Sequence, residues 1–380
     1  MELDRTTVPL HPRRALGCLD VAVRFYGEHL MRMLAIWVVV ALPFSVLVYL
    51  LTVRSQMDVR LTLIVLYAAT WISGVLTVAG SARALFGEPF FPDRGREADF
   101  LRVSSITVDI ACVVVFAFVA ADVTADMLGT DFVFGAEEAM WYWGLFALLA
   151  TRLILHFAAT ARVTPGFWKA LSQSGVRRAL LLAAPLLILF PMHWGLVLIG
   201  IVLSIVALLV ALRTSFLPES IFLSSLDEKL HGRGVRDLLK KEGGDLFARS
   251  LLIVPFCVLL SIVVFFTIDQ ACNLLLGYPI LLGRLDQILP RESIQREADT
   301  AFGDAAANGI GRAGTIVIVA LKFLLSDSRC LAVLTAAVLF VFPIARLAWF
   351  FCYIDLRVRR DCWDMELLFQ QEARRLERTA

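Results

Sequence analysis

Charged residues are scarce in this sequence, and its longest apolar stretch has none. Only 18 % of the 380 residues are charged and 59 % are hydrophobic, whereas soluble domains average about 25 % charged and about 45–50 % apolar residues. Residues 179–212 contain no Asp, Glu, Lys or Arg. A single helix through this stretch would measure about 51 Å, against a hydrocarbon core of roughly 30 Å. The composition therefore excludes an ordinary soluble protein and predicts a multi-pass protein of the lipid bilayer.

The charge-free stretch is too long for one crossing, and we expect it to form a hairpin of two short membrane helices. Residues 191–195, Pro-Met-His-Trp-Gly, supply the turn. Arg177 and Arg178 precede the stretch and Arg213 follows it, so the positive-inside rule places both of its ends in the cytoplasm. The first leg, residues 179–190, would measure only about 18 Å. A re-entrant element that stops inside the membrane is therefore the alternative.

Six further apolar runs are long enough to span the bilayer. Together with the hairpin, they predict an all-α integral membrane protein with about eight transmembrane helices. The expected crossings lie near residues 33–53, 61–82, 103–121, 140–161, 179–190, 194–212, 251–276 and 330–353.

Lys and Arg gather in alternate connections between these crossings, as a fixed membrane orientation requires. The basic segments are residues 1–32, 83–102, 162–178, 213–249 and the tail after 354, whereas the connection 122–138 has acidic residues but no Lys or Arg. We therefore expect the protein in the cell (inner) membrane with both termini in the cytoplasm. The expected units are a cytoplasmic N-terminal segment 1–32, a membrane domain 33–354 and an amphipathic cytoplasmic tail 355–380.

Amphipathic stretches precede several of the outgoing crossings. The clearest one has apolar residues at helical spacing opposite charged ones, namely Leu16, Leu19, Val23, Tyr26 and Leu30. A further example is residues 235–246, which include Leu246, and residues 166–176 repeat the pattern less clearly. Helices of this kind lie in the membrane interface with their basic groups toward anionic headgroups. We expect the first of them within the N-terminal segment.

Motifs of common enzymes are missing. The sequence has no G-x-x-x-x-G-K-S/T loop, no H-E-x-x-H and no G-x-S-x-G. Its G-x-G-x-x-G match at residues 309–314 is expected in a loop, without the strand and βαβ unit that dinucleotide binding needs. None of the seven cysteines forms a C-x-x-C pair, so neither a disulfide framework nor a metal site is expected. We expect no enzyme and no cofactor, and the net charge of +2 does not indicate a nucleic-acid partner.

Four ionisable residues fall inside expected crossings, where a charge is costly unless it is paired or hydrated. Arg152 and His156 lie four residues apart and therefore on one helix face. Asp109 lies at a similar depth on the preceding crossing, so an ion pair with Arg152 is expected, and Arg346 lies on the last crossing. The four residues form either a polar pathway or ligand site, or an inter-helix ion pair with arginines that reach toward the membrane surface. Asp269, near the outer end of its crossing, is expected at the interface.

Two segments of the chain, at residues 16–43 and 353–367, resemble a bacterial family of multi-pass membrane proteins that is related to the membrane domain of glycerophosphoryl diester phosphodiesterases. One is the entry segment from Leu16 to His29, which leads into an apolar run ending in Leu-Pro at 42–43. The other is the tail segment Tyr-Ile-Asp-Leu-Arg-Val-Arg-Arg at 353–360, followed by Trp-Asp-Met-Glu-Leu at 363–367. The tail residues that carry the resemblance are Tyr353, Asp355, Arg357 and Arg359. The family often has Glu-Gly after the last arginine, where this chain has Asp-Cys.

The resemblance implies a helical membrane domain with no assigned catalytic residues, of a kind often encoded near cell-envelope proteins. We expect the stand-alone form, because the phosphodiesterase activity would need a further soluble barrel of roughly 250 residues. The leading expectation is a non-enzymatic scaffold or partner subunit for another envelope membrane protein. The alternative is a transporter or lipid-handling protein that uses the cluster of Asp109, Arg152, His156 and Arg346.

Overall fold

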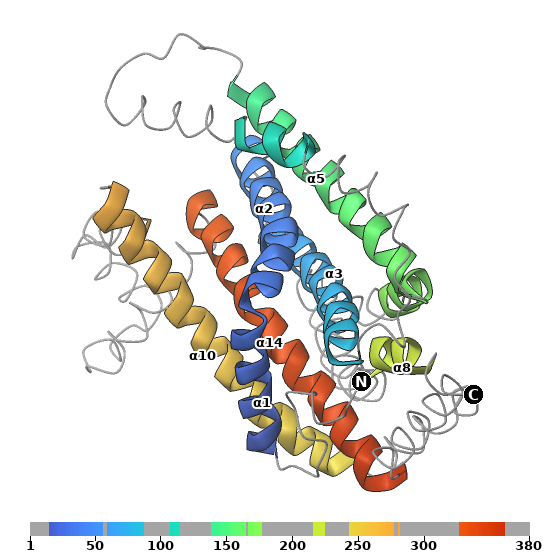
Figure 1. Ribbon diagram of the computed structural model, residues 1–380. Helices are drawn as coiled ribbons and strands as arrows, with labels where there is room; N and C mark the ends of the chain where they lie inside the picture. Colours follow the sequence, from blue (N-terminus) through green and yellow to red (C-terminus); the bar gives the residue numbers. More distant parts are fainter. Residues whose placement is uncertain are drawn as a thin grey trace, which may run out of the picture.

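Helices account for all regular secondary structure in the part of the chain that the computed structural model describes (Figure 1). The described residues are 15–55, 59–86, 107–114, 138–164, 166–176, 216–224, 243–276, 280–281 and 327–361. No strand occurs among them. The all-α fold class predicted from the sequence is therefore confirmed for these residues.

Five helices in the described part of the chain are long and apolar enough to cross a membrane. They are α2 (Leu30–Ser55), α3 (Val59–Phe86), α5 (Glu138–Val163), α10 (Gly243–Leu276) and α14 (Ser328–Asp361). Each of them overlaps a predicted crossing. Pro43, Pro255 and Pro343 lie inside three of them, as membrane helices allow. These helices indicate a membrane location.

The other three predicted crossings fall wholly or largely outside the described residues. The crossing expected at 103–121 is described only at 107–114, where the chain is helical. The hairpin expected at 179–190 and 194–212 lies entirely outside the described residues. The count of eight crossings therefore stays a prediction, and so does the choice between a hairpin and a re-entrant element.

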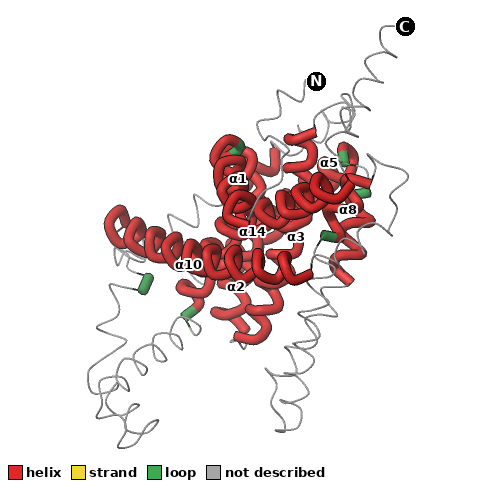
Figure 2. Tube along the Cα trace, turned by 90° about the horizontal axis from the view of Figure 1, so that it is seen from below, coloured by secondary structure: helices red, strands yellow, loops and turns green. Residues whose placement is uncertain are grey.

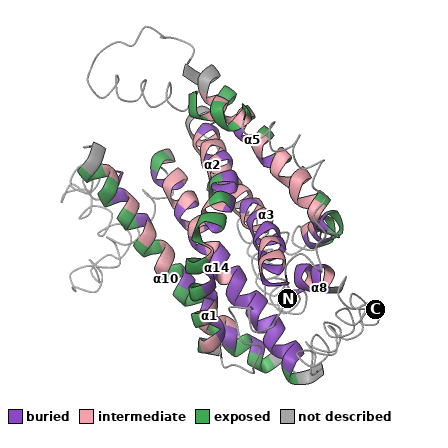
Figure 3. Ribbon diagram, viewed as in Figure 1, coloured by how far each residue is buried: buried purple, intermediate pink, exposed green. Residues whose placement is uncertain are grey.

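α14 is the central helix of the bundle. It packs against α1 (Ala15–Glu28), α2, α3 and α10, and Figure 2 shows it in the middle of the molecule. Among the 18 residues of the apolar stretch that marks it as a candidate span, 56 % are buried, compared with 17 % of the corresponding residues in α10 and 11 % of those in α5. Figure 3 shows the same contrast between a buried centre and exposed outer helices. α5 and α10 lie on opposite sides of the bundle (Figures 1 and 2).

Three pairs of packed helices run antiparallel, and one end of the bundle is therefore rich in arginine. Three contacts establish the directions: Ile36 with Gly80, Tyr49 with Tyr142, and Arg249 with Asp355. Cys18, in the helix that leads into α2, also contacts Arg249. The starts of α2 and α10 therefore lie at the same end of the bundle as the ends of α3, α5 and α14. The alternating basic connections of the sequence predict this arrangement for the five helices.

α14 is longer than a bilayer is thick, and α1 covers part of the extra length. Its 34 residues measure about 51 Å, against a hydrocarbon core of roughly 30 Å. α1 packs along α14, and the rings of Phe25 and Phe351 lie 5.6 Å apart. The buried face of α1 consists of Cys18, Leu19, Ala22, Phe25 and Tyr26. Of the five apolar residues predicted to share one face, Leu16, Val23 and Leu30 are exposed, whereas Leu19 and Tyr26 are buried.

The two other amphipathic stretches have different outcomes. Residues 167–176 are helical, as predicted for 166–176, and pack against α3 through Trp71 and Ser174. α10 already begins at Gly243 rather than near residue 251. Leu246, which was expected in an interfacial helix, therefore belongs to the spanning helix and is buried.

Candidate functional site

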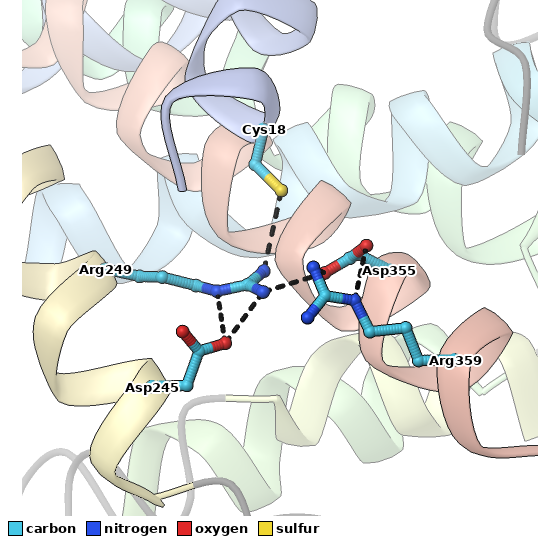
Figure 4. A network of polar contacts seen from close by, with 5 residues as sticks. All are labelled: Cys18, Asp245, Arg249, Asp355 and Arg359. Atoms are coloured by element: carbon cyan, nitrogen blue, oxygen red, sulfur yellow. Dashed lines mark hydrogen bonds and ion pairs between the residues drawn. The ribbon is translucent and has the colours of Figure 1, made fainter. Parts of the chain in front are cut away.

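Arg249 lies at the centre of a network of ion pairs at the arginine-rich end of the bundle (Figure 4). Its Nη2 atom is 2.7 Å from Oδ2 of Asp245 on α10 and 2.8 Å from Oδ2 of Asp355 on α14. Asp355 also pairs with Arg359, whose Nη2 atom is 3.1 Å away. The Nη1 atom of Arg249 donates to Sγ of Cys18 on α1 at 3.6 Å. The network thus joins three helices that are far apart in the sequence.

Helical spacing forms each half of the network within a single helix. Asp245 and Arg249 are four residues apart on α10, and Asp355 and Arg359 are four apart on α14. Opposite charges at this spacing face each other, and the acid stands first in both pairs, which is the more favourable order. Only the contact between Arg249 and Asp355 depends on how α10 and α14 pack.

The central pair is buried, while the flanking partners are half exposed. The side chains of Arg249 and Asp355 are 1 % and 2 % exposed, compared with 43 % for Asp245 and 38 % for Arg359. Two arginines and two aspartates balance in charge. A buried ion pair is costly unless further hydrogen bonds satisfy both members, and here each member has a second charged partner. Such a set holds α1, α10 and α14 in fixed relative positions.

The family-like tail residues lie on the last turns of α14, which continues unbroken to Asp361. Asp355 and Arg359 belong to the network just described. The ring of Tyr353 is buried 5.3 Å from that of Phe216, and Arg357 is also buried. The first residues of the predicted cytoplasmic tail thus form part of the helix, and residues 362–380 lie outside the described part of the chain.

The predicted intramembrane pair of Asp109 and Arg152 is present. The Nε atom of Arg152 donates to Oδ1 of Asp109 at 2.5 Å, and the two side chains are 19 % and 49 % exposed. Arg152 lies near the middle of the candidate span Tyr142–Val163. His156 lies one turn further along α5. The pair is therefore partly exposed on the surface of the described part of the molecule.

Arg346, the fourth member of the predicted cluster, pairs with a residue that the sequence analysis did not select. Its Nη2 atom is 2.6 Å from Oε2 of Glu219. Glu219 lies in α8 (Leu217–Ser224) and is fully buried, and Arg346 is 8 % exposed. The Cδ atom of Arg346 also lies against Gly74 of α3, where the missing side chain leaves room. The structure thus brings Asp109 and Arg152 together and supplies Arg346 with a different carboxylate.

Asp269 is turned into the protein instead of toward the membrane interface. It is 1 % exposed, and its Oδ1 atom accepts the backbone N–H groups of Ile280 and Leu281, both at 2.9 Å. Cys330, at the start of α14, donates its thiol to the carbonyl of Ile280 at 3.5 Å. Buried backbone donors need partners, and the carboxylate supplies them. α10 is therefore tied to α14 at this end as well as through Arg249.

Tyr26 of α1 is a buried phenol that holds a long-range contact to α14. Its hydroxyl donates to the carbonyl of Phe340 at 3.4 Å, and the two rings meet edge to face. Burial raises the pKa of Tyr26 to about 12. The hydroxyl therefore stays a neutral donor at physiological pH.

Sequence reasoning missed Arg249, Asp245 and Glu219. The available signal for the first two was an acid followed four residues later by a base at the start of an apolar run. Glu219 stood in a segment that was interpreted only as basic. Among the described residues, no group of three or more His, Cys, Asp or Glu side chains is placed to hold a metal ion.

Comparison with protein-family models, with curated proteins and with solved structures gives no match for this chain. The family resemblance of the entry and tail segments therefore stays a prediction. The structure adds one fact about these segments: Cys18 from the entry segment and Asp355 and Arg359 from the tail segment meet in the network around Arg249.

Proposed function

We propose that this protein is a non-enzymatic multi-pass membrane protein that binds another envelope membrane protein along the outer face of α10. The observation that carries the proposal is that α10 is fixed to α14 at both ends while its outer face is exposed. Arg249 anchors one end, and Asp269 anchors the other through residues 280–281. A helix held in this way is preorganised, which lowers the ordering cost of binding.

The outer face of α10 is a continuous apolar stripe. Its residues follow one another at intervals of three or four and are between 45 % and 60 % exposed, namely Leu251, Val254, Val258 and Ile262. Lipid tails are as apolar as such side chains, so specific binding of a helix depends on close packing. A rigid stripe supports that kind of packing better than a mobile one.

The proposal places the protein in the inner membrane of a bacterial cell, with both termini in the cytoplasm. Its support is that the arginine-rich ends of the five spanning helices lie together, since such ends are retained on the cytoplasmic side. α1 then lies on that side, with exposed Leu16 and Val23 available to the membrane interface.

Photocrosslinking in native membranes tests this function. A photoreactive amino acid in place of Val258 is expected to give one discrete product with a different membrane protein. The matched control is Val38 of α2, which is also exposed, at 41 %, and is expected to give no such product. Lipid adducts alone at Val258, or the same products at both positions, would overturn the proposal.

A transporter or lipid-handling protein is the second candidate, and the position of Asp109 and Arg152 at the middle of a membrane span favours it. In this case the predicted cluster lines a hydrated path, and water reaches His156. A membrane-impermeant thiol reagent would then modify His156→Cys much faster than Ile154→Cys, whose native side chain is 65 % exposed on the outer surface. Equally slow modification of both variants, in a background without other cysteines, would exclude the path.

A further inference from the structure

A charged pair is partly exposed at the middle of a helix that is long and apolar enough to cross a membrane. Arg152 lies about 15 Å from either end of the span Tyr142–Val163. The side chain of Asp109 is 49 % exposed and that of Arg152 is 19 % exposed. Exposed apolar residues lie near the pair, namely Ile110, Val113 and Ile154, and Thr107 and Thr151 are exposed beside them. A charged pair that faces hydrocarbon is unfavourable, so we expect another protein surface to pack against it.

The contact between the two side chains uses only part of their bonding capacity. It joins the Nε atom of Arg152 to the Oδ1 atom of Asp109 at 2.5 Å. A guanidinium group carries five N–H donors, and a carboxylate accepts at both of its oxygens. The donors of Arg152 and the acceptors of Asp109 are complementary to each other. A surface that holds both therefore matches a second copy of itself across a two-fold axis.

Small residues lie on the outward face of α5 beside the pair. Gly144, Ala147 and Thr151 are exposed and follow one another at intervals of three and four, which places them on one face. A Cβ atom added at Gly144 would meet no atom within 4 Å. Small residues at exposed positions let two membrane helices approach closely. This face therefore permits the close approach that a second ion pair between copies needs.

We propose that this surface is the interface of a homodimer, in which Arg152 of one copy pairs with Asp109 of the other while each keeps the partner in its own chain. The four charges then form a closed set that the surrounding apolar side chains shield from lipid. α10 lies on the opposite side of the bundle (Figures 1 and 2), so the dimer leaves the outer face of α10 free for another protein. A lipid headgroup does not fit this site, because headgroups lie at the membrane surface.

Complementation between two single variants tests the pairing across the interface. Asp109→Asn removes the acid and Arg152→Gln removes the base, and each is expected to lower co-purification of two differently tagged copies on the order of tenfold. Co-expression of the two variants restores co-purification, because one copy keeps Arg152 and the other keeps Asp109. Size-exclusion chromatography checks that each variant is folded.

Two outcomes of this experiment would contradict the homodimer. If the pair acts only within a subunit, both chains stay defective and co-expression restores nothing, which overturns the homodimer. If neither single variant lowers co-purification of the two tagged copies, the homodimer is overturned as well.

Cys112 offers a second measurement that leaves the pair unchanged. It lies three residues beyond Asp109 and is partly exposed. A short membrane-permeant bismaleimide is expected to link two copies through Cys112 in native membranes, and Cys112→Ser removes the product. Buried Cys257 of α10 is the internal control. A product that joins Cys112 to a different protein, or the absence of any crosslinked product, contradicts the homodimer. The photocrosslink at Val258 tests the function proposed for α10 independently of this result.

Discussion

The Nη2 atom of Arg249 on α10 lies 2.8 Å from the Oδ2 atom of Asp355 on α14, and both side chains are buried. Each residue has a second, half-exposed charged partner on its own helix. The pair therefore joins two helical segments that already carry balanced charge. It holds the peripheral helix α10 on the central helix α14 and, through Cys18, holds α1 there too.

Removal of one member of this pair is expected to destabilise the protein strongly. Arg249→Leu or Asp355→Leu leaves the other charge buried without its main partner, at a cost of about 3–5 kcal/mol. The double variant Arg249→Met with Asp355→Leu should recover much of this loss, since no charge is stranded. Thermal unfolding of the purified protein in detergent, followed by tryptophan fluorescence, measures all three.

Arg359→Leu is the matched control for the buried pair. It removes an ion pair with the same aspartate, but the side chain of Arg359 is 38 % exposed, so the loss should stay within about 0–1 kcal/mol. An Arg249→Leu variant that is as stable as Arg359→Leu would contradict the importance of the central pair.

Asp269→Ala is expected to loosen the other attachment of α10. The backbone N–H groups of Ile280 and Leu281 lose their acceptor, and Cys330, which is bonded to Ile280 and fully buried, becomes accessible. Site-resolved mass spectrometry after maleimide labelling should show faster modification of Cys330 in this variant. Asp269→Asn keeps an acceptor oxygen and should show a smaller increase. Unchanged labelling in both variants would mean that Asp269 does not hold this segment.

Gly175→Ala is expected to disturb the packing of residues 167–176 on α3. A Cβ atom at this position would lie only 2.5 Å from Cζ2 of Trp71, so the indole must move and lose its 2.9 Å hydrogen bond to Ser174. Such overpacking costs about 1–3 kcal/mol. Gly27→Ala in α1 is the control, because its Cβ would meet nothing within 4 Å and alanine favours a helix by up to about 1 kcal/mol. Thermal stability should fall for the first variant and hold or rise for the second.

The raised pKa of Tyr26 predicts a loss of stability in alkaline solution. An unfolded tyrosine ionises near its ordinary pKa of 10.0, whereas the buried one ionises near 12. The neutral phenol therefore contributes its full share of stability below pH 10 and loses it as the pH rises to about 12. Tyr26→Phe should make the free energy of unfolding depend less on pH between about 10 and 12. At pH 7 this variant should lose only the contribution of one long hydrogen bond. Chemical unfolding across pH 8–12 would show identical slopes for both proteins if the prediction were wrong.

The long apolar runs predicted the five helices that are long and apolar enough to cross a membrane, because a bilayer accepts few other structures. The alternating arginines also predicted their directions, since Arg83 and Arg162 end their helices on the side where Arg249 begins its own. The pair of Asp109 and Arg152 was predictable for a simple reason. Two single charges at equal depth on successive crossings have few other partners inside a membrane.

The partners of Arg346 and Arg249 could not be predicted in this way. Glu219 and Arg346 are 127 residues apart, and both the basic segment around Glu219 and the tail of α14 offer several charges of each sign. Helical spacing pairs Asp245 with Arg249 and Asp355 with Arg359, but it does not say which of these residues becomes buried. That choice depends on which faces of α10 and α14 meet.

The sequence by itself indicated a membrane protein and determined the helical architecture and the relative directions of the five long helices. These follow from local quantities, namely the apolar length of each run and the charge of each connection. Only the tertiary structure decided that α14 is central, that α1 packs along it, and that Arg249, Asp355 and Cys18 meet. The physical reason is that burial depends on the rotation and contact of whole helices, and several rotations satisfy the same apolar pattern when lipid is as apolar as the protein interior.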